Sequence, residues 1–239
     1  MTTDRPTVLT STALLALALT AGGCTTGARL TPAPGASEGA RVAEETVIDR
    51  IDGVEMTIEV DAWPGSPAVE REVTPIQISI DNDSQRPVRF AYQNLALVTD
   101  RGERLSALPI FRAERKASDA VEPPVTTIGF HHRRFTVAPH LHAYFPSLTL
   151  SHHHFPYDPL YNTHYYDFWL EGRIEMAQVR LHGLPEGVLE PDGEISGFVF
   201  FEKVDPEIDR VRLRADLVDA DSGEVFGSLS IPFEVVEKG

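Results

Sequence analysis

The chain has few cationic side chains for its size. Lysine and arginine together number 21 against 36 aspartates and glutamates, which gives a formal net charge of −15 at pH 7. Nucleic-acid binding needs clustered lysine and arginine on the protein surface to meet the phosphates. The excess of carboxylates therefore argues against a nucleic-acid partner, and it favours a soluble surface that repels other copies of the chain.

Recognisable catalytic motifs are also missing. The sequence contains no GxSxG nucleophile elbow, no HExxH zinc motif and no glycine-rich phosphate loop. Serine, histidine and aspartate occur together between residues 147 and 158, but a catalytic triad is defined by its geometry and not by proximity in sequence. The sequence therefore predicts that the protein is not an enzyme, and a hydrolase is the third functional alternative.

Cysteine occurs once, at Cys24, so no internal disulfide bond can form. Cys24 follows an apolar run over residues 8–20 and the small residues of 21–23, and that run is too short to span a bilayer comfortably. Small residues before a cysteine at the end of such a run resemble the lipobox of bacterial lipoproteins. The resemblance implies that residues 1–23 are a signal peptide and that Cys24 carries a lipid anchor. The alternative is an ordinary secretory signal with an incidental cysteine.

The lipoprotein resemblance also implies a location. Thr25 follows the cysteine at the place where an aspartate is the usual inner-membrane retention signal. In a Gram-negative host this implies the outer membrane, at its periplasmic face or at the surface, with the membrane as a partner through the anchor. Residues 24–45 are small, polar and interrupted by proline and glycine, without an apolar period, which predicts a flexible tether.

Short runs of alternating apolar residues make up most of the chain after residue 46. They occur at residues 54–63, 76–80, 88–92, 195–201, 211–217 and 225–235. Short strands separated by turns are typical of a β-sandwich or a barrel. Residues 189–193 have turn chemistry, and Gly197 predicts a bulge or close backbone packing. One helix is expected at residues 171–182, ended by Gly183.

Three segments of this scaffold carry a second resemblance: VTPIQISIDND, PVRFAYQNLALVTDRG and EGVLEPDGEISGFVFFEKV. They look like the immunoglobulin-like domain of uncharacterised bacterial lipoproteins. The resemblance covers most of residues 54–236 apart from the histidine-rich middle. It implies an all-β fold, an immunoglobulin-like antiparallel β-sandwich over residues 46–239 with at most one or two short helices. It carries no activity, because a fold alone does not specify function.

A long irregular insertion over about residues 108–170 interrupts this scaffold. Eight of the nine histidines lie between His131 and Trp169. Neutral imidazole is a ligand for zinc, copper or nickel, and three or four converging rings would make a site. The candidate ligands are His140, His142, His152, His153, His154 and His164. Their spacing matches no known metal motif, so the alternative is a surface loop whose histidines cover the end of the sandwich.

Aromatic side chains in the same insertion favour a binding surface. Tyrosine and tryptophan supply large amphipathic contact areas, which enriches them where proteins bind partners. The candidate residues are Tyr157, Tyr161, Tyr165, Tyr166 and Trp169. The alternative is that a long ordered loop needs a small core of its own, although connections of this length are more often functional or disordered than idle.

Together these features predict a lipid-anchored cell-envelope protein that serves as a non-catalytic binding or structural module at the membrane surface. Another envelope protein is a candidate partner. The main alternative is a periplasmic lipoprotein that binds a divalent metal ion, zinc, copper or nickel, through the histidine-rich insertion; otherwise no cofactor is expected. A specific metal would raise thermal stability, because a ligand that binds only the folded state stabilises it.

Overall fold

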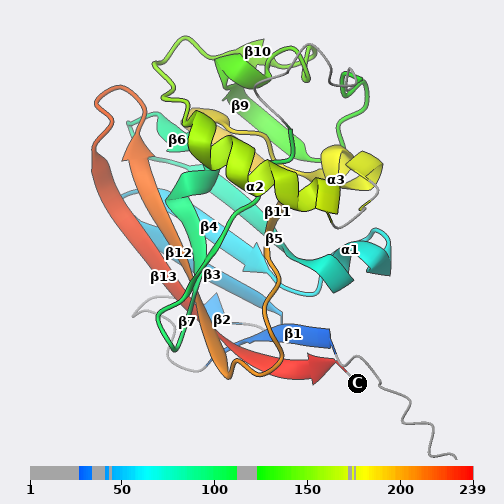
Figure 1. The fold of residues 1–239 in the computed structure, drawn as a ribbon. Helices are drawn as coiled ribbons and strands as arrows, with labels where there is room; N and C mark the ends of the chain where they lie inside the picture. The colour runs from blue at the N-terminus through cyan, green and yellow to red at the C-terminus, as the bar shows by residue number, and fades with distance from the viewer. Residues whose placement is uncertain are drawn as a thin grey trace, which may run out of the picture.

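The computed structural model describes residues 27–33, 41–42, 45–111, 123–171, 174 and 176–238. Its strands are β1 (Gly27–Pro32), β2 (Arg41–Val42), β3 (Thr46–Ile51), β4 (Val54–Glu59), β5 (Val73–Asn82), β6 (Val88–Phe90), β7 (Leu95–Thr99), β8 (Arg104–Ser106), β9 (His131–Val137), β10 (Thr149–Leu150), β11 (Gly187–Glu202), β12 (Arg210–Asp219) and β13 (Val225–Lys238). Its α-helices are α1 (Pro67–Glu72), α2 (Pro159–Glu171) and α3 (Met176–His182), with short 3-10 turns η1 (Tyr92–Asn94) and η2 (Pro139–Leu141). Strands dominate, which confirms the predicted all-β scaffold (Figure 1).

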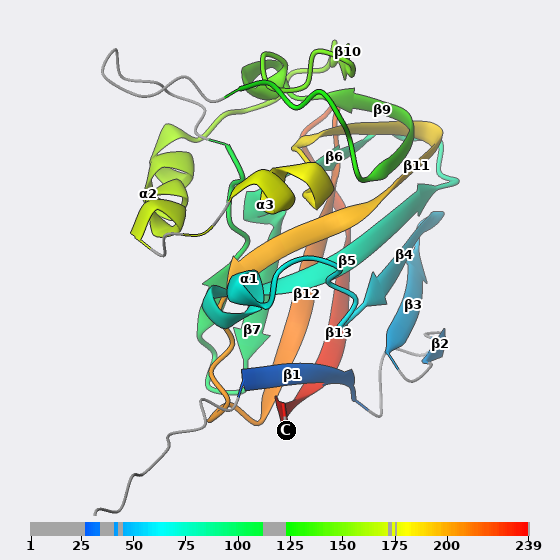
Figure 2. The same cartoon turned by 90° about the vertical axis from the view of Figure 1, so that its right-hand side faces the viewer.

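The strands form one continuous, strongly curved sheet. Their order is β1-β13-β12-β6-β11-β5-β4-β3-β2, with β7 and β8 joined through β12, and β9 and β10 joined through β11. Figure 2 shows the curvature of the sheet. This curvature brings β3 into contact with β13, and a Cβ at Gly227 of β13 would lie 3.3 Å from the Ile51 side chain. The finer prediction of an immunoglobulin-like sandwich is not confirmed, because the sheet is nearly barrel-shaped.

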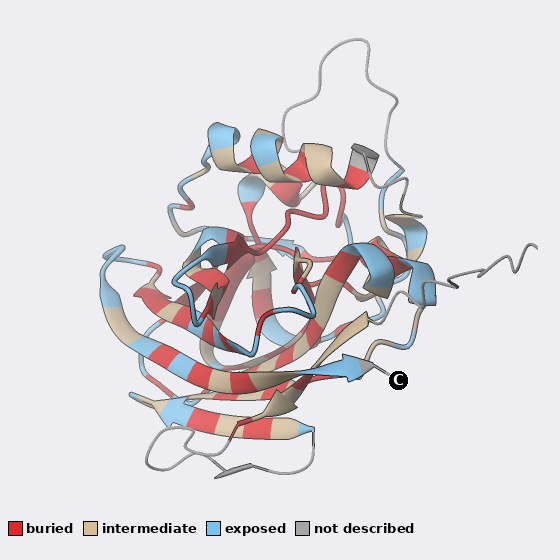
Figure 3. Ribbon diagram, turned by 60° about the horizontal axis from the view of Figure 1, so that its bottom comes forward, coloured by how far each residue is buried: buried red, intermediate tan, exposed pale blue. Residues whose placement is uncertain are grey.

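Alternating residues of the strands supply the core. Ile76, Ile78 and Ile80 of β5 are buried, as their spacing predicts. Figure 3 shows buried residues alternating with more exposed ones along the long strands. Gly197 of β11 sits in a close contact of the kind that the sequence predicts, because a Cβ there would lie only 2.7 Å from the Leu184 side chain.

β11 is the strand at which the sheet bends. Its residues 193–202 pair with β5, whereas residues 187–189 pair with β6. The register against β9 shifts between Leu189 and Glu194, and Asp192 has a φ of 58°. A bulge of this kind bends a strand and re-aims its side chains. The predicted turn at residues 189–193 is therefore wrong, because its turn residues form a bulge inside one strand.

The first described strand belongs to the sheet. β1 pairs antiparallel with the end of β13, from Gly27 opposite Lys238 to Pro32 opposite Phe233. The Leu30 side chain is buried in the main core. Residues 27–32 of the predicted tether are therefore a strand and not a flexible link. They have no apolar period, but the edge of β13 offers backbone N–H and C=O groups with which an extended segment can pair. Cys24 and the predicted signal peptide lie outside the described residues.

The insertion contains more regular structure than the sequence predicts. It includes β9, β10 and α2, and the three α-helices exceed the one or two expected. α2 begins at an aspartate cap: Asp158 Oδ1 accepts hydrogen bonds from the N–H groups of Leu160 (2.9 Å) and Tyr161 (3.1 Å), and Pro159 occupies the first turn. The weak helix formers that follow hide this signal. α3 confirms the second half of the helix expected at residues 171–182.

Candidate functional site

A groove of about 720 Å³ opens at the end of the sheet where β1 lies. β1, the two residues 60–61 that follow β4, α1, the start of β5 and the connection at residues 203–206 form its walls. Its deep part is apolar, because Leu30, Val60 and Val204 line it and are buried. Arg71 and Glu72 of α1 are exposed at its rim. Small-molecule sites in proteins are clefts of about 300–1,000 Å³ with mostly apolar walls and a few polar groups, so the groove has the dimensions of a ligand site.

Charges of both signs are fixed around the groove. Arg29 of β1 forms ion pairs with Glu45 and, through Nε at 3.2 Å, with Asp61 Oδ2. The Lys203 ammonium donates a 2.6 Å hydrogen bond to the carbonyl oxygen of Glu70. Mixed charges around an apolar interior suit an amphipathic molecule better than a strongly charged one. These residues could not be predicted as a site, because the sequence places no recognisable motif there.

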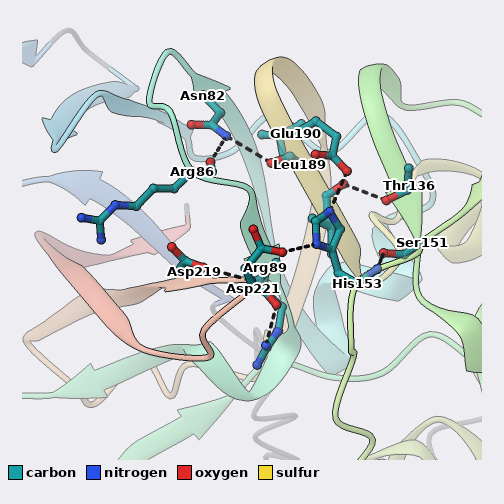
Figure 4. Close-up of polar contacts among 12 residues, drawn as sticks. Asn82, Arg86, Arg89, Thr136, Ser151, His153, Leu189, Glu190, Asp219 and Asp221 are labelled. Carbon is teal, nitrogen blue, oxygen red and sulfur yellow. Dashed lines mark hydrogen bonds and ion pairs between the residues drawn. The ribbon is translucent and has the colours of Figure 1, made fainter.

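A second polar site lies around His153, where the β12–β13 hairpin meets the bulge of β11 (Figure 4). The ring Nδ1 is 2.8 Å from Asp221 Oδ1 in the hairpin, and Nε2 is 3.0 Å from Glu190 Oε1 in the bulge. Burial lowers the pKa of the imidazole, but the hydrogen bonds to Glu190 and Asp221 outweigh burial, so the pKa lies above its ordinary value. His153 therefore links three segments that are distant in sequence.

Residues 151–158, called the His153 loop below, rest on a small core of their own. Phe155 packs with Ala91, Ala138, Val188 and Ala220 in a cluster separate from the main core. The buried Arg89 side chain of β6 lies 6.0 Å from the centre of the Phe155 ring and donates a 3.3 Å hydrogen bond to the carbonyl oxygen of Ala220. Burial lowers the pKa of the Arg89 guanidinium, and Asp219 opposes that shift.

His140 forms a separate pair with Glu186. Its Nε2 is 2.9 Å from Glu186 Oε2, and the two side chains are only 11% and 12% exposed. The other carboxylate oxygen of Glu186 accepts a 2.9 Å hydrogen bond from the backbone N–H of Tyr92. The His140 ring lies 4.8 Å from the Tyr157 ring. Glu186 therefore links His140 of η2 to Tyr92 of η1, and these contacts stabilise the packing of the two turns.

The six predicted metal ligands do not form one cluster. His140 and His153 have different carboxylate partners, His142 is half-buried, and His152, His154 and His164 are exposed. Within the part of the chain that the structure describes, no group of three or more His, Cys, Asp or Glu is placed to hold a metal ion. The His153 side chain is partly buried between its two carboxylate partners, whereas its neighbours His152 and His154 are exposed.

The aromatic residues of α2 hold the helix on residues 106–111 and do not form an open surface. Trp169 is 1% exposed and Tyr166 is 3% exposed. Trp169 Nε1 donates to the Pro109 carbonyl oxygen at 2.7 Å, and the Tyr161 hydroxyl donates to the Ala107 carbonyl oxygen at 2.6 Å. A buried segment needs partners for its carbonyl groups, and these side chains supply them.

The remaining aromatic candidates lie partly inside. Tyr157, Tyr161 and Tyr165 are half-buried, and the Tyr165 hydroxyl accepts a 2.9 Å hydrogen bond from Ser106 Oγ. A binding surface made of all five aromatic residues is therefore wrong for Tyr166 and Trp169, whose rings are inside. The predicted alternative, in which aromatic residues give the insertion a core, accounts for their placement.

Comparison with known proteins gives no relative. No protein-family model, curated protein or solved structure matches the chain. In the described residues, no helix has the length and apolar character needed to cross a membrane.

Proposed function

We propose that the chain is a lipid-anchored cell-envelope protein that acts without catalysis and binds an amphipathic small molecule in the groove beside β1. The observation that carries this proposal is the groove itself, about 720 Å³ with buried aliphatic walls and a charged rim. The envelope location rests on the resemblance of residues 8–24 to a lipoprotein signal, and it does not require the sheet to be immunoglobulin-like.

The chain geometry relates the proposed anchor to the groove. Gly27 lines the groove and is paired with the end of β13. Cys24 precedes Gly27 by three residues, and three residues span at most about 10 Å. An anchor at Cys24 therefore brings this end of the sheet to the membrane surface, so that the groove opens towards lipid headgroups. An amphipathic ligand from the membrane reaches it there without crossing water.

The experiment is native mass spectrometry of the full chain extracted from bacterial envelopes in mild detergent. We expect a bound small molecule at close to one copy per chain. Ala28→Trp places a large side chain in the half-buried groove wall and should remove the adduct. The matched control is Val225→Trp, because Val225 is 58% exposed at the other end of β13 and should leave the adduct unchanged. No adduct on the wild type, or equal adducts on both variants, contradicts a ligand in the groove.

The positions of the six histidines do not favour a metal site. Within the described residues, His140 and His153 pair with different carboxylates, and no group of three or more His, Cys, Asp or Glu is placed to hold a metal ion.

A further inference from the structure

We infer that the His153 loop is a pH-sensitive latch, closed while the His153 ring carries a proton on both nitrogens and opened when the ring loses one of them. The site lies where the β12–β13 hairpin meets the bulge of β11 (Figure 4). The inference does not depend on the groove or on the lipid anchor, because no residue of the latch lines the groove.

The hydrogen-bond geometry favours a charged ring. Each imidazole nitrogen has a carboxylate oxygen within 3.0 Å, Asp221 on one side and Glu190 on the other. An imidazolium has two N–H donors, whereas a neutral imidazole has one donor and one acceptor. In the neutral ring one nitrogen lone pair would face a carboxylate oxygen. Deprotonation therefore replaces one of the two attractive contacts with a repulsive one.

The surrounding charges favour the cation. Glu190 reaches the ring from β11, and Asp221 reaches it from the hairpin. Asp219 in the same hairpin accepts backbone hydrogen bonds from Ser222 and Asp221, which lower the pKa of its carboxyl. Arg89 of β6 is the basic group that packs on the loop, and its guanidinium donates to the Ala220 carbonyl oxygen. On the loop itself, His152 and His154 are exposed to solvent.

The consequence of release is local. The loop is held by the His153 contacts, by the Phe155 cluster and by the 2.9 Å bond from Ser151 N–H to the Val137 carbonyl oxygen. Phe155 lies 5.7 Å from the His140 ring. When the loop lifts, the Phe155 ring leaves its cluster and uncovers His140 together with its partner Glu186. The latch therefore exposes an apolar patch and a histidine–carboxylate pair as pH rises.

Linkage fixes the sign and the size of the effect. The closed loop has the higher His153 pKa, because both carboxylate contacts favour the charged ring. The stabilisation is fully present below the pKa of the open loop, about 6.5 for an unperturbed histidine. It is lost as pH rises through the pKa of the closed loop. Between these two values the closed-to-open ratio falls by at most about tenfold per pH unit.

The test is an NMR titration of the full chain in detergent micelles, with the nine histidines labelled at Cε1 and His153 assigned from a His153→Gln variant. We expect a His153 pKa above about 6.5, and it should fall in both Glu190→Gln and Asp221→Asn. The matched control is Glu224→Gln, an exposed carboxylate of the same hairpin without a contact to His153. It should leave the titration unchanged.

Amide hydrogen exchange of residues 151–158 supplies the second readout on the same sample. After correction for intrinsic exchange, the protection factor should fall as pH rises from about 6.5, the pKa of the open loop, through the measured His153 pKa. The total fall should equal ten raised to the difference between these two pKa values. A His153 pKa at or below about 6.5 overturns the latch. Protection that is independent of pH, or a pH dependence that persists in His153→Gln, also overturns it.

Discussion

Trp169 shows how one side chain of the insertion can serve two structural purposes. Its ring is 1% exposed in the main core, and its Nε1 donates to the Pro109 carbonyl oxygen. We expect Trp169→Ala to lower the free energy of unfolding by about 3–5 kcal/mol, because it leaves a large cavity. Trp169→Phe retains much of the ring but leaves the buried carbonyl without its donor, so we expect a loss of about 1–3 kcal/mol. Urea denaturation measures both.

The same helix offers a matched control. His164 is exposed on α2, and His164→Ala should change the free energy of unfolding by less than about 0.5 kcal/mol. If Trp169→Ala costs no more than this control, the buried position of the ring is contradicted and the predicted role of Trp169 as a binding-surface residue is restored.

At the residue scale, burial could be predicted where it depends on local alternation. Ile76, Ile78 and Ile80 follow the predicted pattern because a strand places every second side chain on one face. The partners of His153 could not be predicted in this way. Glu190 and Asp221 are 37 and 68 residues away from it in sequence, and only the curvature of the sheet brings them together. A histidine-rich composition says nothing about which ring meets which carboxylate.

At the scale of elements, β1 carries a clear prediction. Its pairing with β13 and the buried Leu30 side chain should protect its bonded amides from hydrogen exchange by about 100-fold or more, an opening free energy of about 2.8 kcal/mol. Leu30→Ala should reduce this protection while leaving the amides of β5 unchanged. The matched control is Thr31→Ala, a half-buried neighbour whose side chain points to the other face.

Exchange of the β1 amides at the rate of an unfolded chain would show that residues 27–32 are a tether after all. Equal effects of Leu30→Ala and Thr31→Ala would show that β1 is held by backbone pairing without help from the core.

Two elements show where the local sequence does not determine the structure. The turn residues at 189–193 are the same residue types that form a bulge, so composition could not separate a chain reversal from a bent strand. In α2, Asp158 and Pro159 give a favourable start, but the tyrosines and histidine that follow are poor helix formers. Tertiary packing against residues 106–111 decides in favour of the helix, and that packing is invisible in a local window.

At the scale of the whole molecule, the two sites lie at opposite ends of β13. Gly27, beside the groove, pairs with Lys238, whereas the hairpin of the latch precedes Val225. These positions are separated by thirteen strand residues, a path of about 40 Å. The proposed anchor therefore leaves the groove at the membrane and the His153 loop in the surrounding solution, where changes of pH reach it directly.

The orientation of the anchored molecule tests the central claim most directly. Cys24 is the only cysteine of the chain. The proposed lipid anchor would block its thiol, so that a single engineered cysteine would be the one labelling site for a fluorophore. Arg71→Cys labels the rim of the groove, and Glu224→Cys labels the hairpin. Each full chain is purified from bacterial membranes and placed in phospholipid vesicles that carry a quencher on the headgroups. We expect strong quenching at position 71 and little at position 224, with no labelling of the wild-type chain. Equal quenching at the two positions, or a wild-type chain that is labelled at Cys24, would contradict an anchored protein whose groove faces the membrane.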